Sequence, residues 1–419
     1  MKILLGIIFG FLTIAGAPLF LVISAAALVS FYLLGINPSL VIIEMYRLAA
    51  NPLLIALVYF SFAGYLLAEG SAGRRLVRLS TAIFGYLPGG LAIVCLVSCA
   101  FFTAITGASG VTIVALGGIL LPALLEERYP ENFALGLITS SGSLGLLFPP
   151  SLPLIIYGLV SGASIPKLFL AGVLPGVLAI FLLSIYSVYV GVRERSDTVR
   201  FTLRGLTQAA REAIWELLLP VVVFGGIFSG FLALSEAAAV TVFYVLVVSL
   251  LIRRDVKLRQ VPGIAVRTIM MVGGLIVILG AALAFNSFLV DQEVPMKTLR
   301  FIQTHVESRF VFLGMLNLFL LVVGCLLDVY SALLVITPLL VPVAQAYHID
   351  LLHLGVIFLT NLQIGLLHPP IGMNLFIASL RFDKSVLRLS WAALPFLGIL
   401  LVALAIITFV PELTLLLVR

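Results

Sequence analysis

Residues 145–150 read "GLLFPP", and residues 365–370, which lie 220 positions further along, read "GLLHPP". Both double prolines fall inside long apolar runs that otherwise have the composition of membrane helices. Proline lacks a backbone N–H and clashes with the preceding turn, so a pair of prolines predicts the end of a helix. We therefore predict two broken membrane helices, at about 132–162 and 351–380.

The composition places the whole chain in a membrane. Of its 419 residues, 62% are hydrophobic and 10% are charged, and the mean hydropathy is +1.27. A water-soluble domain needs a far more polar surface, whereas about 20 apolar residues suffice for one helical span. The opening apolar run is too long for the hydrophobic region of a signal peptide, so we predict a retained first span at 3–33. The predicted fold class is an all-α polytopic membrane protein.

The charges orient this protein in the membrane and do not indicate a nucleic-acid partner. The net charge is +6, but the basic residues cluster in short loops such as 193–211 and 253–267. This is the pattern of the positive-inside rule, so we assign these loops to the cytoplasm and expect no nucleic acid. The three cysteines, Cys95, Cys99 and Cys325, lie in apolar segments and are interpreted as packing residues.

The remaining hydrophobic segments complete the predicted membrane protein. Two of them, 91–125 and 310–346, are interrupted at their centres and predict re-entrant helical hairpins, the first entering from the cytoplasm and the second from outside. Uninterrupted spans are predicted at 52–70, 167–190, 216–234, 235–251, 263–290 and 387–410.

A shift of 220 residues carries one half of the chain onto the other. It matches the two Gly-Leu-Leu-x-Pro-Pro motifs, the two hairpins and their flanking spans. Each half has an even number of full spans, so the additional span at 216–234 inverts the second half. We therefore predict two inverted repeats, 1–190 and 235–419, joined by a cytoplasmic loop and linking span at 191–234. In proteins of this plan, substrate and coupling ions bind near the midplane at unwound helices.

The broken helices predict a cation site. Backbone carbonyls that a proline pair leaves unpaired are costly at membrane depth unless protein, water or a cation satisfies them. A proline kink satisfied by neighbouring helices is the alternative interpretation, but two breaks in register favour a site. Oxygen donors surround both breaks without clustered carboxylates, which suits a monovalent ion better than Ca²⁺ or Zn²⁺. These donors are Ser140, Ser141, Ser143 and Ser151 at the first break, and Asn361 and Asn374 at the second.

The hairpin centres supply further polar groups. The first reads "TAITGASGVT" at 103–112 and contains Thr106, Gly107 and Ser109. The second contains Asp328 and Ser331. A carboxylate within the membrane is a functional candidate by default. Asp328 also suits the N-cap of the second hairpin arm, and the two roles are compatible.

Other polar residues have simpler interpretations. His305 and His353 are interpreted as loop or interface residues, and His348 as a loop residue. His368 lies in the second break, where it could sense protons or touch substrate. Glu236 is interpreted as part of the first turn of a helix, capped by the preceding serine.

Six motifs together resemble the large membrane (M) subunit of tripartite ATP-independent periplasmic (TRAP) transporters, the DctM-like members of the ion transporter superfamily. The resemblance runs from near residue 16 almost to the C-terminus. The motifs are "GYLPGGLA" at 85–92, "ITGASGV" at 105–111, "GLLFPPSLPLIIYG" at 145–158, "SEAAAV" at 235–240, "LLDVYSALLVITPLLVPVA" at 326–344 and "TNLQIGLLHPPIGMNLFIAS" at 360–379.

This resemblance implies sodium-driven uptake of a small organic anion, such as a C4-dicarboxylate, a 2-oxoacid or a sialic acid, across the inner membrane. It implies two protein partners, a periplasmic substrate-binding protein (P-type) and a small four-helix membrane subunit (Q-type). It also implies an elevator-type mechanism, in which a transport domain slides past a scaffold domain. Na⁺ is then the coupling ion, and no organic cofactor is implied.

The resemblance also assigns residues to three sites. The first sodium site would lie between the first hairpin tip and the first break, at Thr106, Gly107, Ser109, Gly145, Pro149 and Ser151. The second would lie at Asp328, Ser331, Asn361, Gly365, Pro369, Gly372 and Asn374. Substrate would lie between the two tips, near Ala108, Ser109, Pro150, His368 and Pro370.

The sequence departs from the family pattern at the sites and not in the fold. Ala108 stands where the family usually has a serine, and Val111 and Thr112 stand where it usually has Ala-Asp. His368 stands where a threonine is usual. These positions bear on the ligands of the first sodium site and on the substrate class.

The residues leave two other functions open. A stand-alone sodium- or proton-coupled organic anion carrier would share the repeat but not the partners. An intramembrane enzyme would need converging acid, base or metal groups, for which Asp328 and His368 are the candidates, in two distant motifs. The chain contains no P-loop motif, so ATP is not its energy source. We therefore expect a transporter and not an enzyme.

Overall fold

The computed structural model describes residues 19–33, 37, 39–49, 51–195, 200–369 and 372–418. Within these ranges the chain is built of helices, and no strand occurs. Eight of the described helices are long and apolar enough to cross a membrane, and a bent pair of helices makes up to nine. The predicted all-α membrane fold is confirmed. Of the predicted first span, only 19–33 lies within the described residues, where it forms helix α2.

The two halves of the chain contain corresponding series of helices. The first half contains α2 (Leu19–Leu33), α3 (Ser39–Ala49), α4 (Pro52–Glu69), α5 (Ala72–Phe84), α6 (Gly90–Thr106), α7 (Ser109–Glu126), α8 (Glu131–Ser141), the 3-10 turn η1 (Leu144–Leu147), α9 (Leu152–Ser161) and α10 (Ile165–Arg193). Between the halves lie α11 (Leu203–Glu212) and α12 (Ile214–Phe228). The second half contains α13 (Leu234–Leu246), η2 (Val247–Ile252), η3 (Leu258–Gln260), α14 (Val261–Asp291), α15 (Val294–His305), α16 (Arg309–Leu326), α17 (Val329–Ala346), α18 (Leu351–Gly365), α19 (Met373–Phe382), α20 (Val386–Phe409) and α21 (Glu412–Leu415).

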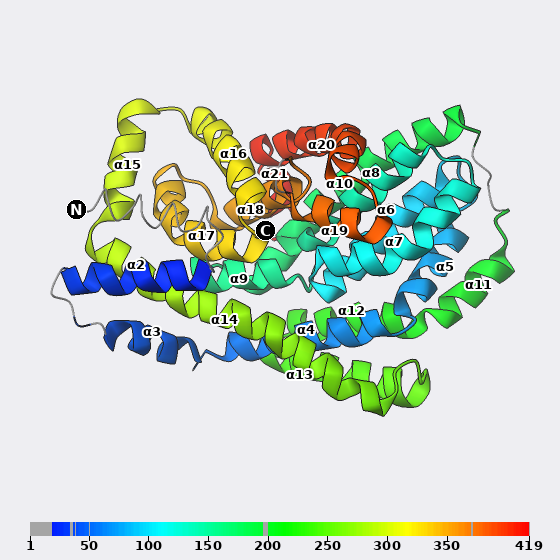
Figure 1. Cartoon of the computed structure of the whole chain (residues 1–419), viewed down its shortest axis with the longest axis horizontal. Coiled ribbons are helices and arrows are strands. Elements are labelled where there is room, and N and C mark those ends of the chain that lie inside the picture. Colours follow the sequence, from blue (N-terminus) through cyan, green and yellow to red (C-terminus); the bar gives the residue numbers. More distant parts are fainter. Residues whose placement is uncertain are drawn as a thin grey trace.

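The 220-residue shift that relates the motifs also relates the helices. It carries α7, Ser109–Glu126, onto Val329–Ala346, which are the bounds of α17. It also carries the end of α6 onto the end of α16. Helices α5 and α15 correspond under this shift, yet they lie at opposite ends of the molecule (Figure 1). Opposite placement of equivalent helices agrees with the predicted inversion of the second repeat.

The helices form two groups. In the first, α4 packs against α13 and α14, and α14 also packs against α2 and α3 (Figure 1). We call α2–α4 and α12–α14 the scaffold layer. In the second, α6 packs against η1 and α10, α8 against α20, and α16 against α18. We call α6–α10 and α16–α20 the hairpin layer; α5 and α15 connect the two layers.

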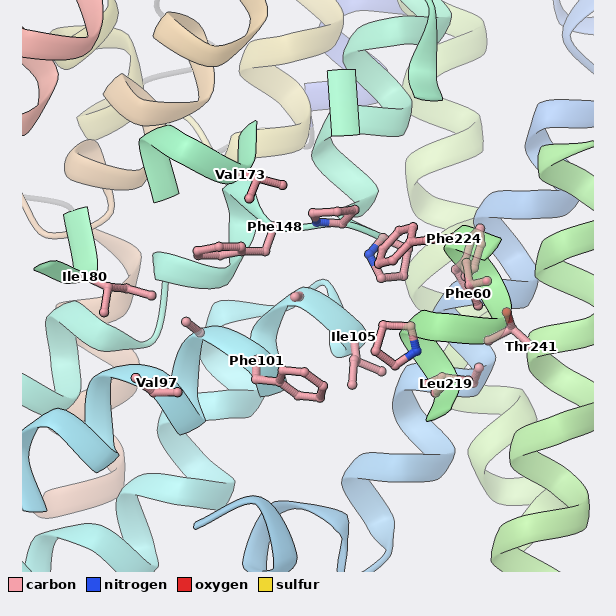
Figure 2. A pocket seen from close by; sticks show the side chains of 17 residues that line it. Phe60, Val97, Phe101, Ile105, Phe148, Val173, Ile180, Leu219, Phe224 and Thr241 are labelled. Carbon is pink, nitrogen blue, oxygen red and sulfur yellow. The ribbon is translucent and has the colours of Figure 1, made fainter. Parts of the chain in front are cut away.

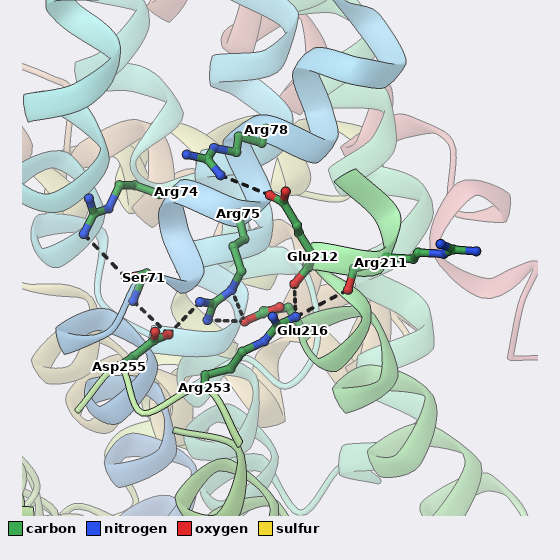
Figure 3. A network of polar contacts seen from close by, with 9 residues as sticks. All are labelled: Ser71, Arg74, Arg75, Arg78, Arg211, Glu212, Glu216, Arg253 and Asp255. Carbon is green, nitrogen blue, oxygen red and sulfur yellow. Dashed lines mark hydrogen bonds and ion pairs between the residues drawn. The ribbon is translucent and has the colours of Figure 1, made fainter. Parts of the chain in front are cut away.

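Buried ion pairs hold α5 in place (Figure 3). The Arg75 guanidinium contacts carboxylate oxygens of Glu216 on α12 and of Asp255, both at 2.6 Å. The Glu216 side chain is 1% exposed, so its charge depends on this partner. Nearer the surface, the Arg78 guanidinium donates to Glu212 at 3.1 Å and lowers the pKa of that carboxyl. Arg75 therefore fixes a connecting helix to the scaffold layer.

Some local predictions need correction. His353 is not a loop or interface residue, because it is fully buried in α18, where its ring contacts the Thr414 hydroxyl at 2.9 Å and the Thr408 carbonyl at 3.2 Å. Glu236 does lie in the first turn of α13, but the N-cap residue is Ala233 and not Ser235. The Glu236 carboxylate accepts the Ala233 N–H at 2.8 Å. Helices α5 and α15 are absent from the predicted spans because they are short and contain basic residues.

Candidate functional site

A cavity of about 680 Å³ lies where the tips of the two hairpins approach each other. Its walls contain the first tip, at 107–110, and the second tip, at 328–330. The helices that follow the two breaks contribute Pro153 and Met373. The scaffold layer contributes Tyr65, Glu69, Arg267 and Met271. Elements of both repeats and both layers therefore meet at one cavity.

The first hairpin packs directly on the first break. Gly107 ends α6 with φ +69°, a left-handed conformation that side chains disfavour, and so allows the tight turn into α7. The Thr103 hydroxyl donates to the Gly142 carbonyl in the break at 2.8 Å. A Cβ atom at Gly145 would lie 2.3 Å from the carbonyl oxygen of Ala100, so only glycine permits this approach. The break is thus held against the first hairpin arm by close backbone contact.

The second hairpin meets the second break in an equivalent way. A Cβ atom at Gly365 would lie 2.4 Å from the carbonyl carbon of Gly324 on α16. The Cys325 thiol lies 3.4 Å from the His368 carbonyl oxygen and 3.5 Å from that of Pro369. In both repeats, therefore, the first hairpin arm approaches the glycine that begins the break.

Asp328 begins the second arm of its hairpin as the N-cap of α17. Its Oδ2 atom accepts the N–H groups of Tyr330 at 3.0 Å and of Ser331 at 3.2 Å. The capping role predicted from the sequence is thereby confirmed. The same side chain lies on the cavity wall, and the cap uses only one of its two carboxylate oxygens. Capping and contact with a cation are therefore compatible.

Hydrogen bonds join the two repeats beside the cavity. The Ser109 hydroxyl at the first tip donates to the side-chain oxygen of Asn374 on α19 at 2.9 Å. Asn374 is fully buried, and its amide nitrogen donates to the Thr139 carbonyl on α8 at 3.3 Å. The Tyr330 hydroxyl at the second tip donates to the Gly107 carbonyl at 2.7 Å. The first hairpin tip is thus bound to two elements of the second repeat.

Three of the predicted sodium ligands carry buried oxygens that have no hydrogen-bond partner among the described residues. They are the hydroxyls of Thr106 and Ser331 and the side-chain oxygen of Asn361, in residues that are 2%, 1% and 0% exposed. A buried polar atom without a partner costs free energy, so such atoms indicate where water or a cation completes the bonding. Within the described ranges, no three His, Cys, Asp or Glu side chains gather into a group. Hydroxyl, amide and carbonyl oxygens fit an alkali-metal ion better than a transition metal.

The first proline pair lies on a different cavity. Pro149 and Pro150 line a space of about 290 Å³ between α6, α10 and the scaffold helices α4 and α12 (Figure 2). Aromatic and aliphatic side chains such as Phe148 and Phe224 line it, and none of the described residues in its wall is charged. An apolar space of this kind does not compensate the desolvation of an anion. Pro150, predicted to touch substrate, therefore faces apolar groups here.

The remaining predicted residues lie at the edges of the two breaks. Ser151 is buried, and its hydroxyl donates to the Leu146 carbonyl at 2.5 Å. The Gly372 N–H donates to the His368 carbonyl at 3.0 Å. The His368 side chain is exposed. Pro370 lies outside the described residues.

Sequence reasoning missed the side chains that the scaffold layer adds to the cavity. Tyr65 and Glu69 come from α4, and Arg267 and Met271 come from α14. Arg267 is the one lysine or arginine among the described residues that line this cavity, and it donates to the Glu69 carboxylate at 2.9 Å. The sequence contains only an indirect signal for these residues. The 220-residue shift places α4 within α14, which makes the two helices equivalent in the two repeats.

These features define a class of protein. Two inverted repeats each supply a hairpin and a broken helix, and hydroxyl groups and the backbone of both hairpin tips converge on one cavity in a membrane fold. Secondary transporters bind substrate and coupling ions at such an interface between inverted repeats. The fold and the site are those of a secondary membrane transporter.

Comparison with known proteins identifies the family. Residues 5–413 match the tripartite ATP-independent periplasmic transporter, DctM component, and the chain belongs to this family. It is 34% identical to the C4-dicarboxylate TRAP transporter large permease protein DctM of Pseudomonas aeruginosa, over 86% of this chain and 85% of that protein. It is 30% identical to the isethionate TRAP transporter permease protein DctMQ of Oleidesulfovibrio alaskensis, over 97% of this chain and 65% of that protein.

The fold also resembles a solved transporter structure. The crystal structure of the Alcanivorax borkumensis YdaH transporter aligns with a TM-score of 0.60 and 15% sequence identity, over 88% of this chain and 86% of that chain. The predictions of a TRAP large membrane subunit, and of a transporter rather than an enzyme, are confirmed by the family match and the relatives. The protein is a multi-pass TRAP large permease.

Proposed function

We propose that this permease carries out sodium-coupled secondary active uptake of a small organic anion. The observation that carries the proposal is the cavity at which both hairpin tips meet. Buried hydroxyls without partners in the described part of the chain, those of Thr106 and Ser331, belong to the two hairpins that form it. Such groups are suited to bind and release an alkali-metal ion without a permanent cluster of carboxylates.

Two sodium ions would bind, one at each place where a hairpin meets its break. The first would contact Thr106, Gly107 and Ser109 on the hairpin and the break from Gly145 to Ser151. The second would contact Asp328, Ser331, Asn361 and Asn374, with the backbone at Gly365 and Gly372. Positive charge at these places lowers the electrostatic cost of bringing an anion to the cavity. Ion and anion then stabilise each other's binding, which is the basis of coupling.

The organic anion would bind in the cavity, beside Ala108 and Ser109 and within reach of Arg267. A guanidinium matches the two oxygens of a carboxylate. Glu69 already accepts a hydrogen bond from Arg267, so an incoming carboxylate would compete with Glu69. Relatives named for a C4-dicarboxylate and for isethionate support a small organic acid as substrate. His368, at the second break, is a further candidate for substrate contact.

An elevator motion would carry this cavity across the membrane. The hairpin layer would move as the transport domain, and the scaffold layer would stay in place. The repeats would be 1–190 and 235–419, with 191–234 as the connection. The support for this assignment is that α5 and α15 link the two layers at opposite ends of the molecule, where a hinge is needed at each end (Figure 1).

The transporter would work in the inner membrane of a bacterial or archaeal cell with two partners. One would be a periplasmic substrate-binding protein, and the other a small four-helix membrane subunit. The matching family is described as one component of a tripartite periplasmic transporter, which supports both partners. The relative named DctMQ is longer than this chain, which covers 65% of it.

Uptake into proteoliposomes tests the proposal. The substrate is first identified from the melting temperature of the binding protein in the presence of a panel of organic acids. Uptake of the radiolabelled acid is then compared under inward sodium and inward potassium gradients of equal size, with both partners present. We expect uptake under the sodium gradient and not under the potassium gradient. Equal uptake with potassium would refute sodium coupling, and uptake without partners would favour a stand-alone carrier.

A further inference from the structure

Tyr330 contacts residues of both proposed sodium sites. Its hydroxyl donates to the Gly107 carbonyl at 2.7 Å, and this bond spans 223 positions of sequence. Its backbone N–H donates to Asp328 Oδ2 at 3.0 Å. Gly107 belongs to the first proposed site and Asp328 to the second, whereas Tyr330 itself is not among the proposed ligands of either. Tyr330 thus joins the two sites, beside the separate hydrogen bond from Ser109 to Asn374.

Two of the buried oxygens without partners among the described residues belong to chain neighbours of this bond. Thr106 directly precedes Gly107, and Ser331 directly follows Tyr330. In the described part of the chain, neither hydroxyl has a hydrogen-bond partner, and the two residues are 2% and 1% exposed. A cation that binds at either hydroxyl therefore acts on one end of the bond between Tyr330 and Gly107.

The bond fixes the direction of a backbone carbonyl at a glycine turn. Gly107 turns the chain at φ +69°, and without a side chain it has more backbone freedom than any other residue. Tyr330 lies in the first turn of α17, which the Asp328 side chain caps. An ion that orders this first turn also orders the tyrosine hydroxyl. Through that hydroxyl, it orients the carbonyl dipole at the other site.

We propose that Tyr330 is a positioning residue that couples the two sodium sites, so that an ion at the second site prepares the Gly107 carbonyl to coordinate an ion at the first. This inference rests on the proposed sodium binding. Coupled sites have a definite signature, because the ions bind cooperatively and loss of the connection lowers the cooperativity. A purely structural hydrogen bond contributes to stability alone.

The test is the substitution Tyr330→Phe, which removes the hydroxyl and keeps the ring. Tyr157→Phe is the matched control, because the Tyr157 hydroxyl also donates to a backbone carbonyl of the other repeat, that of Leu351, at 2.8 Å. That bond lies at the start of α18 and not at the hairpin tips. The melting temperature of the full chain is measured while sodium replaces potassium at constant ionic strength. Binding is thus followed without substrate or transport.

For the parent chain and for Tyr157→Phe, we expect a sigmoid rise of the melting temperature with sodium concentration. For Tyr330→Phe, we expect a half-saturating concentration about three- to tenfold higher, as the loss of one net hydrogen bond predicts, and a Hill coefficient of about 1. Coupling is refuted if Tyr330→Phe follows the parent sodium curve, even if its melting temperature in potassium is lower than that of the parent. It is also refuted if Tyr330→Phe does not fold. An equal change in Tyr157→Phe refutes it too. A parent chain that sodium and potassium stabilise equally would instead refute the proposed function.

Discussion

The Ser109 hydroxyl donates a 2.9 Å hydrogen bond to the side-chain oxygen of Asn374, across 265 positions of sequence. This bond ties the tip of the first hairpin to the helix that follows the second break. The Asn374 amide nitrogen simultaneously donates to the Thr139 carbonyl at 3.3 Å. One buried amide therefore connects α7, α8 and α19, which come from both repeats.

We expect Asn374→Ala to destabilise the protein by about 1–3 kcal/mol, because the half-buried Ser109 hydroxyl and the buried Thr139 carbonyl each lose a partner. It should also raise the sodium concentration at half-maximal uptake. The control is Ser390→Ala, which removes a hydroxyl that bonds within its own helix, to Val386 at 2.8 Å. Melting temperatures and sodium titrations of uptake are the measurements. An unchanged sodium half-saturation would remove Asn374 from the ligand set.

Two substitutions of Asp328 separate its cap from its charge. Asp328→Asn keeps an N-cap acceptor and removes the charge, whereas Asp328→Ala removes both. We expect both variants to weaken the sodium dependence of uptake. Asp328→Ala should also lower the free energy of unfolding by about 1 kcal/mol, because that is the typical cost of a lost N-cap. Melting temperatures and sodium titrations distinguish the effects. If Asp328→Asn matches the parent in both, Asp328 is a cap and not a ligand.

Gly365→Ala should be strongly destabilising. The added Cβ atom would lie 2.4 Å from the carbonyl carbon of Gly324, where backbone has to move on both sides. Overpacking of this kind costs about 1–3 kcal/mol or more. At Gly314, on the same helix as Gly324, a Cβ atom meets nothing within 4 Å, so Gly314→Ala is the control and should be neutral or slightly stabilising. Equal melting temperatures of the two variants would contradict the close contact between the second hairpin and its break.

Arg75→Ala should destabilise the protein by about 3–5 kcal/mol, because it leaves the buried Glu216 carboxylate without its partner. The double variant Arg75→Ala with Glu216→Ala should recover part of this loss, since that buried charge is then absent. Arg78→Ala should have little effect, because its side chain is 69% exposed. The melting temperatures of Arg75→Ala, Glu216→Ala and the double variant form a double-mutant cycle, with Arg78→Ala as the control. A double variant that loses the sum of the two single losses would contradict the ion pair.

The repeat and its breaks are predictable from the sequence because glycine and proline leave a linear signature. The Gly-Leu-Leu-x-Pro-Pro motifs recur at one spacing, and the helix bounds follow the same spacing in the structure. Asp328 is predictable as a cap because capping is local. These features depend on neighbours in the chain, which a sequence pattern records.

The walls of the cavity are not predictable in this way. Tyr330 and Gly107 lie 223 positions apart, and no local pattern indicates that a tyrosine in the first turn of α17 reaches the other hairpin. Arg267 reads as one of several basic residues in a cytoplasmic loop until the fold brings α14 to the cavity. His353 likewise finds its partners, Thr408 and Thr414, only through tertiary packing.

Chemical labelling at the first hairpin tip tests most directly that the cavity between the tips is the transport pathway. Ala108→Cys places a thiol on the cavity wall, and the native cysteines Cys95, Cys99 and Cys325 are buried, so the parent chain provides the baseline. A membrane-impermeant thiol reagent is added to each side of oriented vesicles. We predict that the thiol of the Ala108→Cys variant reacts from both sides, and that sodium with the substrate slows the reaction. Reaction from one side alone under every condition, with uptake intact after labelling, would contradict the account.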